Sequence, residues 1–115
     1  MSKKPYTPAI ASKGTLYVSG QIGLNPANGE LVNGGVIAEL KQIMINLRGL
    51  LQQHDCDYDD LVSITIYLRT MDDYKAVNEE YVTYFTNRLP TRTCISVVGL
   101  PFNAAIEITA TAEIK

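Results

Sequence analysis

The sequence predicts a single α+β domain over residues 1–115, in which two helices lie on one side of one β-sheet. Three observations support this class. The chain has 115 residues, which is enough for one hydrophobic core and too few for two domains. Apolar side chains recur every three or four positions in two segments, as in helices, and at every second position in others, as in strands. The segments follow the order strand, helix, strand, helix and a final pair of strands, so both helices can cover the same face of one sheet.

The N-terminal third is predicted to hold little regular structure. Residues 1–13 contain Pro5 and Pro8 among small side chains and are interpreted as an irregular arm. Residues 15–19 alternate apolar and polar side chains, which predicts a short strand. Residues 21–35 are rich in Gly and Asn, which adopt turn conformations at low steric cost, so this segment is predicted to be a loop.

Two later segments have helical periodicity. Residues 36–53 carry a continuous apolar stripe and are predicted to form the first helix, with the stripe in the core. The second helix is predicted to begin at Asp72 or Asp73, either of which can cap it, and to end before Pro90. Its apolar stripe is mostly aromatic and is also interpreted as core: Tyr74, Val77, Tyr81, Tyr84 and Phe85.

The remaining strands complete the sheet. Residues 61–69 are predicted to form a strand with Val62, Ile64, Ile66 and Leu68 toward the helices and Ser63, Thr65 and Tyr67 on the opposite, open face. Residues 90–98 and the strand after residue 104 are predicted to pair as a hairpin. If Ile95 and Ile106 both face the helices, the register leaves Arg92 and Cys94 on the same open face as Glu107.

Arg92 and Glu107 are the only charged residues between Pro90 and Ile108. One interpretation is an ordinary cross-strand ion pair, which contributes about 0 to 1 kcal/mol when exposed. The other is a binding site in which Arg92 holds a carboxylate and Glu107 faces the reacting end of the ligand. Arginine suits this role because its planar guanidinium matches a carboxylate with two hydrogen bonds.

Charge and composition exclude several other classes of function. The net charge is −2 and the Lys and Arg residues are scattered, whereas nucleic-acid binding needs a concentrated positive surface. No apolar run reaches signal-peptide or membrane-spanning length, so a soluble, cytoplasmic protein is expected. The low proportion of charged residues suggests that another subunit covers part of the surface.

The cysteines and the single histidine do not predict a metal site or a disulfide. Residues 54–60 contain His54 and Cys56 among acidic residues, but a structural zinc site usually needs four Cys or His ligands in paired spacing. This segment is therefore interpreted as a connection between a helix and a strand. Cys56 and Cys94 are not expected to pair, because the chain carries no export signal.

Several motifs together resemble the RidA family of reactive-intermediate deaminases, also called the YjgF/YER057c/UK114 family. The resemblance extends over essentially the whole chain, in the right order. The matching segments are Pro5-Tyr6, Val18-Ser19-Gly20-Gln21-Ile22, Asn25-Pro26, Gly29-Glu30-Leu31, Met71-Asp72-Asp73-Tyr74, Ala76-Val77-Asn78-Glu79, Pro90-Thr91-Arg92-Thr93-Cys94, Leu100-Pro101 and Ile106-Glu107-Ile108.

The resemblance implies a chorismate-mutase-like α+β fold and a homotrimer with ligand sites between subunits. It implies hydrolysis of imines derived from enamines, such as 2-aminoacrylate and 2-iminobutanoate, to a 2-keto acid and ammonia, without a metal or organic cofactor. In this reading Arg92 binds the substrate carboxylate and Glu107 positions and activates water. The site would be lined by Tyr6, Ser19, Gly20, Asn78 and the backbone of Cys94.

Two alternatives to the deaminase remain open. One is a non-catalytic trimer that binds small carboxylates as a sensor or scavenger, in which Arg92 would bind the ligand without turnover. The other is RNA cleavage or inhibition of translation, as attributed to some relatives of the family, which has little support because the sequence lacks a basic patch.

Overall fold

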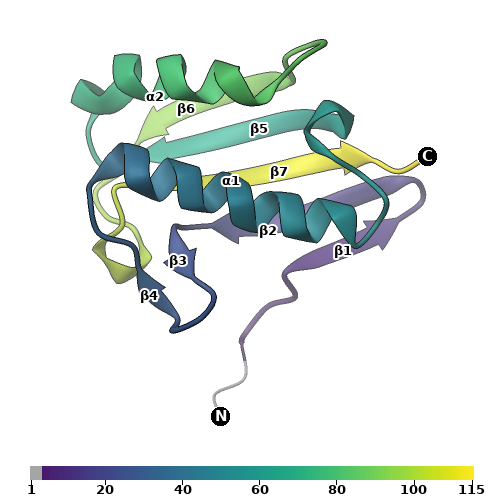
Figure 1. Ribbon diagram of the computed structural model, residues 1–115, viewed down its shortest axis with the longest axis horizontal. Helices are drawn as coiled ribbons and strands as arrows, with labels where there is room; N and C mark the ends of the chain where they lie inside the picture. The colour runs from purple at the N-terminus through teal and green to yellow at the C-terminus, as the bar shows by residue number, and fades with distance from the viewer. Residues whose placement is uncertain (1–3) are drawn as a thin grey trace.

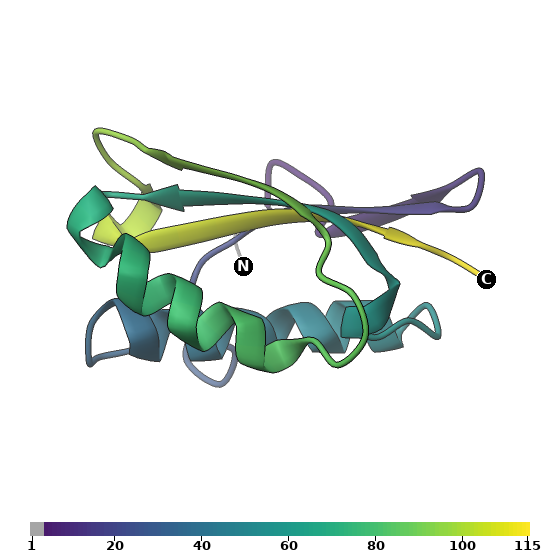
Figure 2. The same cartoon turned by 90° about the horizontal axis from the view of Figure 1, so that it is seen from above.

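Two helices cover one face of a five-stranded sheet in the computed structural model, which describes residues 4–115 (Figures 1 and 2). This confirms the predicted α+β class with both helices on one side. The strands are β1 (Ala9–Ser12), β2 (Thr15–Gln21), β3 (Leu24–Asn25), β4 (Glu30–Leu31), β5 (Leu61–Leu68), β6 (Thr91–Ser96) and β7 (Ile106–Glu113). The helices are α1 (Val36–Gln52) and α2 (Tyr74–Tyr81), and short 3-10 turns occupy Tyr58–Asp60, Met71–Asp73, Val82–Tyr84 and Pro101–Asn103.

The large sheet has the strand order β1-β2-β7-β5-β6, and β3 and β4 form a separate two-stranded pair. Strands β5 and β6 are parallel, whereas β7 is antiparallel to both β2 and β5. The predicted hairpin of the last two strands is therefore wrong, because β5 lies between β6 and β7 (Figure 1). The loop that joins them crosses the end of β5, and sequence spacing alone does not distinguish such a crossing from a tight turn.

The faces of β6 are also the reverse of the prediction. Arg92 is aligned with the buried Ile64 of β5, so its side chain points toward the helices, whereas Ile95 is 44% exposed. Glu107 is aligned with Tyr67 of β5 on the opposite, open face. The predicted common face for Arg92 and Glu107 is therefore wrong. As an edge strand, β6 does not have to bury its apolar side chains against the helices.

The core lies between α1 and the central strands. The predicted first helix is confirmed, with its last residue at Gln52. Its stripe packs on the helix-facing side chains of β2, β5 and β7. The fully buried side chains are Leu16, Leu40, Ile43, Met44, Leu47, Leu51, Leu61, Ile66, Leu68, Val77, Ile106 and Ile108. Within residues 4–115, neither helix has the length and apolar character needed to cross a lipid bilayer.

Two strand predictions need correction. The arm predicted over residues 1–13, whose first three residues lie outside the described part of the chain, contains β1, which pairs with β2. Val62 was expected toward the helices but is 41% exposed, because the pairing of β5 with β7 shifts register between Leu61 and Ser63. Leu61 occupies the buried position instead.

The second helix begins where predicted and ends earlier. Asp73 is its N-cap residue, although the Asp73 side chain makes no capping hydrogen bond. Thr70 caps the preceding 3-10 turn, where its Oγ1 accepts the Asp72 N–H at 3.2 Å. Regular α-helix stops at Tyr81, and a 3-10 turn carries the chain to Tyr84. Because the 3-10 turn continues the helix, the aromatic side chains stay on the side of α2 that faces the sheet, although the helix is shorter than predicted.

Candidate active site

The structure separates the predicted site residues into two groups on opposite sides of the sheet. We call Ser19, Gly20 and Glu107 the acidic half-site and Arg92, Cys94 and Asn78 the arginine half-site. The acidic half-site lies where β2 meets β7 on the open face, and the arginine half-site lies between β6 and α2. The sheet stands between the Arg92 and Glu107 side chains, so one small ligand does not contact both within a single chain.

A bulge in β2 creates the acidic half-site. Val18 is aligned with Ala110 and Gln21 with Ile108, so Ser19 and Gly20 together oppose the single residue Thr109. A Cβ atom on Gly20 would lie 2.9 Å from Glu107 Cδ, closer than real Cβ atoms approach. Glycine is therefore required for the Glu107 carboxyl group to occupy this place.

Burial raises the pKa of the Glu107 carboxyl group above its usual value. Neither of the two ion pairs among the described residues, Arg48–Asp57 and Lys115–Asp60, includes Glu107. A half-buried carboxyl group with a raised pKa exchanges a proton nearer to neutral pH than an exposed one, which suits a general base.

Ser19 fastens the N-terminal arm to β2. Its hydroxyl donates a hydrogen bond to the Thr7 carbonyl at 2.6 Å, and its backbone N–H donates to the Pro8 carbonyl at 2.9 Å. Tyr6, at 51% exposure, lines a groove of about 640 Å³ that Gly20 also borders and that extends along α1. The groove includes Gly20 but neither Ser19 nor Glu107, so within one chain Tyr6 is not brought to the Glu107 carboxyl group.

The arginine half-site is built from one strand and one helix. Arg92 lies against the aromatic faces of two tyrosines of α2, with its Cζ 5.6 Å from the Tyr74 ring centroid and 5.2 Å from the Tyr81 ring centroid. Its Nη2 donates a hydrogen bond to Tyr74 Oη at 3.3 Å. The two ion pairs among the described residues do not include Arg92, so its other N–H donors remain for a ligand.

Two buried polar atoms of α2 lie in this half-site without a hydrogen-bond partner among the described residues. They are Asn78 Oδ1 and Tyr81 Oη. Asn78 follows Tyr74 by four residues and precedes Tyr81 by three, so the three side chains share one face of the helix. Burial raises the pKa of Tyr81 to about 12 although the Arg92 charge lowers it, so this hydroxyl stays protonated near neutral pH.

Cys94 lies two residues from Arg92 on the same side of β6, aligned with Ile66. This differs from the predicted open face. Burial raises the pKa of its thiol, and the opposing effect of the Arg92 charge is smaller. The sulfur is therefore a poor nucleophile near neutral pH. Both Cys94 and Cys56 are free thiols.

Tyr74 and Tyr81 are the site residues that the sequence did not reveal, because their helical spacing assigned them to the core. A signal was present in the residue types. The stripe carries tyrosines where leucine would fill a core equally well, and Asn78 lies between them. Buried tyrosine hydroxyls normally need a polar partner, which points to a polar site rather than to plain core.

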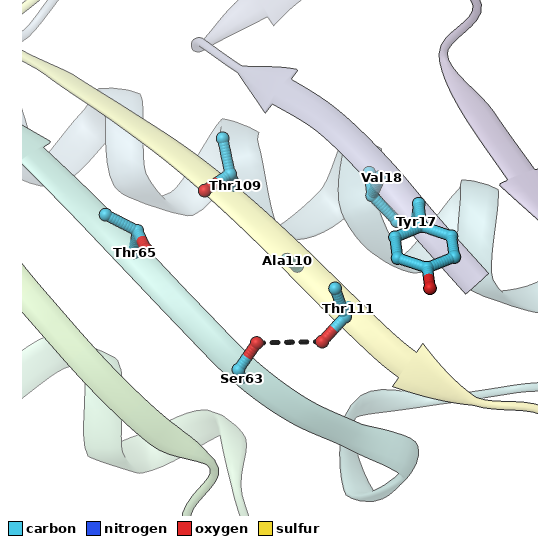
Figure 3. A pocket seen from close by; sticks show the side chains of 7 residues that line it. All are labelled: Tyr17, Val18, Ser63, Thr65, Thr109, Ala110 and Thr111. Atoms are coloured by element: carbon cyan, nitrogen blue, oxygen red, sulfur yellow. Dashed lines mark hydrogen bonds between the residues drawn. The ribbon is translucent and has the colours of Figure 1, made fainter. Parts of the chain in front are cut away.

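The open face of the sheet has the predicted character. Hydroxyl groups and small side chains from β2, β5 and β7 surround a shallow cavity of about 270 Å³ (Figure 3). Across it the Ser63 and Thr111 hydroxyls share a hydrogen bond of 2.8 Å. Among residues 4–115, no three His, Cys, Asp or Glu side chains gather closely enough to hold a metal ion.

The fold places the chain among small α+β proteins with two helices on one face of a mixed sheet. The profile of the family described as Endoribonuclease L-PSP matches residues 1–114. The chain belongs to this family, which is the YjgF/RidA family that its motifs resemble.

Proteins of known sequence and structure agree with this assignment. The chain is 44% identical to the 2-iminobutanoate/2-iminopropanoate deaminase of Mus musculus over 94% of its length and 80% of that protein. It is 41% identical to the Homo sapiens protein of the same name, again over 94% of its length and 79% of that protein. Its fold matches the crystal structure of YyfA from Yersinia pestis, a protein of the Rid family, with a TM-score of 0.94 and 33% identity, covering 98% of this chain and 90% of that one.

Proposed function

We propose that this protein hydrolyses small 2-imino acids to 2-keto acids and ammonia. The expected substrates are 2-iminobutanoate and 2-iminopropanoate, which form from enamines such as 2-aminoacrylate. The relatives named for this activity support the proposal. The observation that carries it is Arg92, a guanidinium held against two aromatic rings with no carboxylate of the described residues paired to it. A 2-imino acid supplies the missing carboxylate.

Imine hydrolysis requires a positioned substrate and proton transfer, and it does not require an activated side-chain nucleophile. In the proposed mechanism Arg92 binds the substrate carboxylate through two N–H donors, which fixes the neighbouring imine carbon. Glu107 accepts a proton from water as the water oxygen bonds to that carbon, while the C=N π electrons move to the nitrogen, which takes up a proton to give a carbinolamine. A second proton transfer to the nitrogen lets the C–N bond break, and ammonia leaves as the hydroxyl loses its proton and the C=O bond of the keto acid forms.

We further propose that each site is shared between two subunits of a homotrimer. The positions of Arg92 and Glu107 on opposite sides of one sheet support this, since a second copy of the chain can bring its acidic half-site to the arginine half-site of the first. The centre of the open face, lined by hydroxyls and small side chains, offers a surface that such a copy can cover. A cytoplasmic location stays a prediction of the sequence.

The test generates 2-iminobutanoate in situ and follows release of the keto acid. We expect the protein to accelerate this release, and Arg92→Ala to lower kcat/KM by about 100-fold, since charge-assisted hydrogen bonds to the carboxylate are lost. Arg48→Ala is the matched control, because Arg48 pairs with Asp57 outside both half-sites. Full activity of Arg92→Ala would refute the proposed role.

The same experiment separates the alternatives. Binding of 2-oxobutanoate that depends on Arg92, without acceleration of keto-acid release, would favour the carboxylate-binding protein over the enzyme. The family description names ribonuclease activity. Degradation of RNA at low salt by the wild-type protein would favour that activity, against which the net charge of −2 and the scattered cations argue.

A further inference from the structure

Two tyrosines of α2 contact Arg92 in the arginine half-site, and neither was among the predicted site residues. From their contacts we infer that Tyr74 and Tyr81 are positioning residues, which hold the Arg92 guanidinium in the orientation that receives the substrate carboxylate. The inference rests on the proposed function and assigns these residues to the control of substrate affinity.

Tyr81 provides the fixed side of this arrangement. Its side chain is 2% exposed, and its ring lies 5.0 Å from the Phe85 ring between centroids, so packing holds it in place. The Arg92 Cζ lies 5.2 Å from the centroid of the same ring. A cation over an aromatic face is attracted by the negative potential of the ring, more strongly where water is displaced. Tyr81 therefore attracts the guanidinium to a defined place.

Tyr74 provides the outer side and fixes the rotation of the guanidinium. Its ring centroid lies 5.6 Å from Arg92 Cζ, and its hydroxyl accepts a hydrogen bond from Nη2 at 3.3 Å. Because the guanidinium is planar and carries five N–H groups, one bond to Tyr74 leaves a pair of donors for a carboxylate. The Tyr74 hydroxyl thus determines which pair of guanidinium N–H groups of Arg92 faces the ligand.

Such positioning matters because Arg92 lies on an edge strand. No acidic side chain pairs with Arg92 among the described residues, and a free arginine side chain samples many rotamers. Ordering it upon binding would weaken the affinity for the substrate. A guanidinium already held by two rings and one hydroxyl binds with less loss of conformational freedom.

The experiment measures KM and kcat for 2-iminobutanoate, and the dissociation constant of 2-oxobutanoate by calorimetry, in Tyr74→Phe, Tyr74→Leu and Tyr81→Leu. For Tyr74→Phe, which keeps the ring and loses the hydroxyl, we expect KM to rise by about three- to tenfold with kcat unchanged. The two leucine variants should raise KM further, by about tenfold or more, because the cation loses an aromatic face.

Tyr58 offers a matched control outside both half-sites. Its ring lies 5.6 Å from Arg48 Cζ, and its hydroxyl donates to the Met44 carbonyl at 2.8 Å. Tyr58→Phe therefore removes a tyrosine hydroxyl hydrogen bond while keeping the ring that lies beside another arginine and packs near Phe85. We expect it to lower the melting temperature and to leave KM unchanged, which distinguishes positioning of Arg92 from a general effect on stability.

A double-mutant cycle with Arg92→Lys tests whether the tyrosines act through the guanidinium. Lysine lacks the planar guanidinium with its paired N–H donors. Tyr74→Phe should therefore cause no further change in kcat/KM in the Arg92→Lys background. The inference is overturned if Tyr74→Phe leaves KM and the dissociation constant at their wild-type values, or if its effect is as large without the guanidinium as with it. In that case wild-type turnover persists and the proposed function stands. A wild-type protein that neither binds 2-oxobutanoate nor accelerates imine hydrolysis overturns both.

Discussion

Gly20 lies directly against the carboxyl group of Glu107, where even a methyl group has no room. A Cβ atom at this position would approach Glu107 Cδ to 2.9 Å, so Gly20→Ala must push the carboxyl group aside or spread β2 from β7. We expect kcat/KM to fall by about 100-fold, because small displacements of a reacting group cost this much, while circular dichroism stays unchanged. Gly49→Ala is the control, since beyond its chain neighbours and the backbone of its own helix no heavy atom lies within 4 Å of its Cβ position, and activity should persist.

The raised pKa of Glu107 predicts a pH-dependent effect on stability. The folded protein holds the Glu107 proton more tightly than the unfolded chain, so ionising this carboxyl group lowers stability as the pH rises from its ordinary value of 4.5 through the raised one. Glu107→Gln, which cannot ionise, should therefore raise the melting temperature at pH 7 and abolish turnover. The gain in melting temperature should disappear below about pH 4, where the carboxyl group is protonated in both states.

Melting curves of Glu30→Gln provide the comparison for that experiment, because Glu30 is exposed on β4. We expect no gain in melting temperature from this substitution at either pH. A Glu107→Gln protein that melts below the wild type at pH 7 would contradict the prediction.

The centre of the open face is lined by uncharged side chains, which predicts sensitivity to a single added charge. Thr109 is aligned with Thr65 in the middle of this face, and its side chain points away from the core. Thr109→Arg should therefore preserve the fold of the monomer while placing a cation in the proposed subunit interface, where desolvation disfavours it. Light scattering after gel filtration should show a shift from trimer to monomer, and kcat/KM should fall with it. A Thr109→Arg trimer with full activity would place the interface elsewhere.

Sites shared between subunits predict that two inactive variants can complement each other. Arg92→Ala keeps Glu107, and Glu107→Gln keeps Arg92. In trimers assembled at random from equal amounts of both, each site draws its two groups from different subunits, so about a quarter of the sites are intact. Co-expression with two affinity tags selects the mixed trimers, each of which holds one intact site of three, so they should show about one third of wild-type activity. If both groups of a site came from one chain, the mixed trimers would stay inactive.

Local sequence patterns were sufficient for much of the fold. The first helix, the buried faces of β5 and β7 and the hydroxyl-rich open face all follow from periodicity, because each depends on which side of one element is apolar. The prediction that Val62 faces the helices was wrong, because an alternating pattern of apolar residues does not reveal the register shift between Leu61 and Ser63. Sequence patterns located the start of the second helix at Asp73 but missed the 3-10 turn before it, which Thr70 caps, because the neighbouring polar residues could each begin a helix.

The candidate site was likewise predicted in part. The residue types of Arg92 and Glu107, with the motifs around them, identified the family and the expected chemistry from the sequence alone. The sequence could not show that Tyr74 and Tyr81 contact Arg92, because an aromatic stripe with helical spacing reads as core until the strand that faces it is known.

The sequence by itself thus determined the two helices, the strands β2, β5 and β7 and the family of this protein, since these are recorded in local periodicity and in short motifs. Only the tertiary structure decided that β5 separates β6 from β7, that Arg92 faces α2, and that Gly20 meets Glu107. The physical reason is that alternation gives a strand two different faces without saying which one meets the helices. On an edge strand such as β6, where burial is partial, contacts with neighbouring elements make that choice.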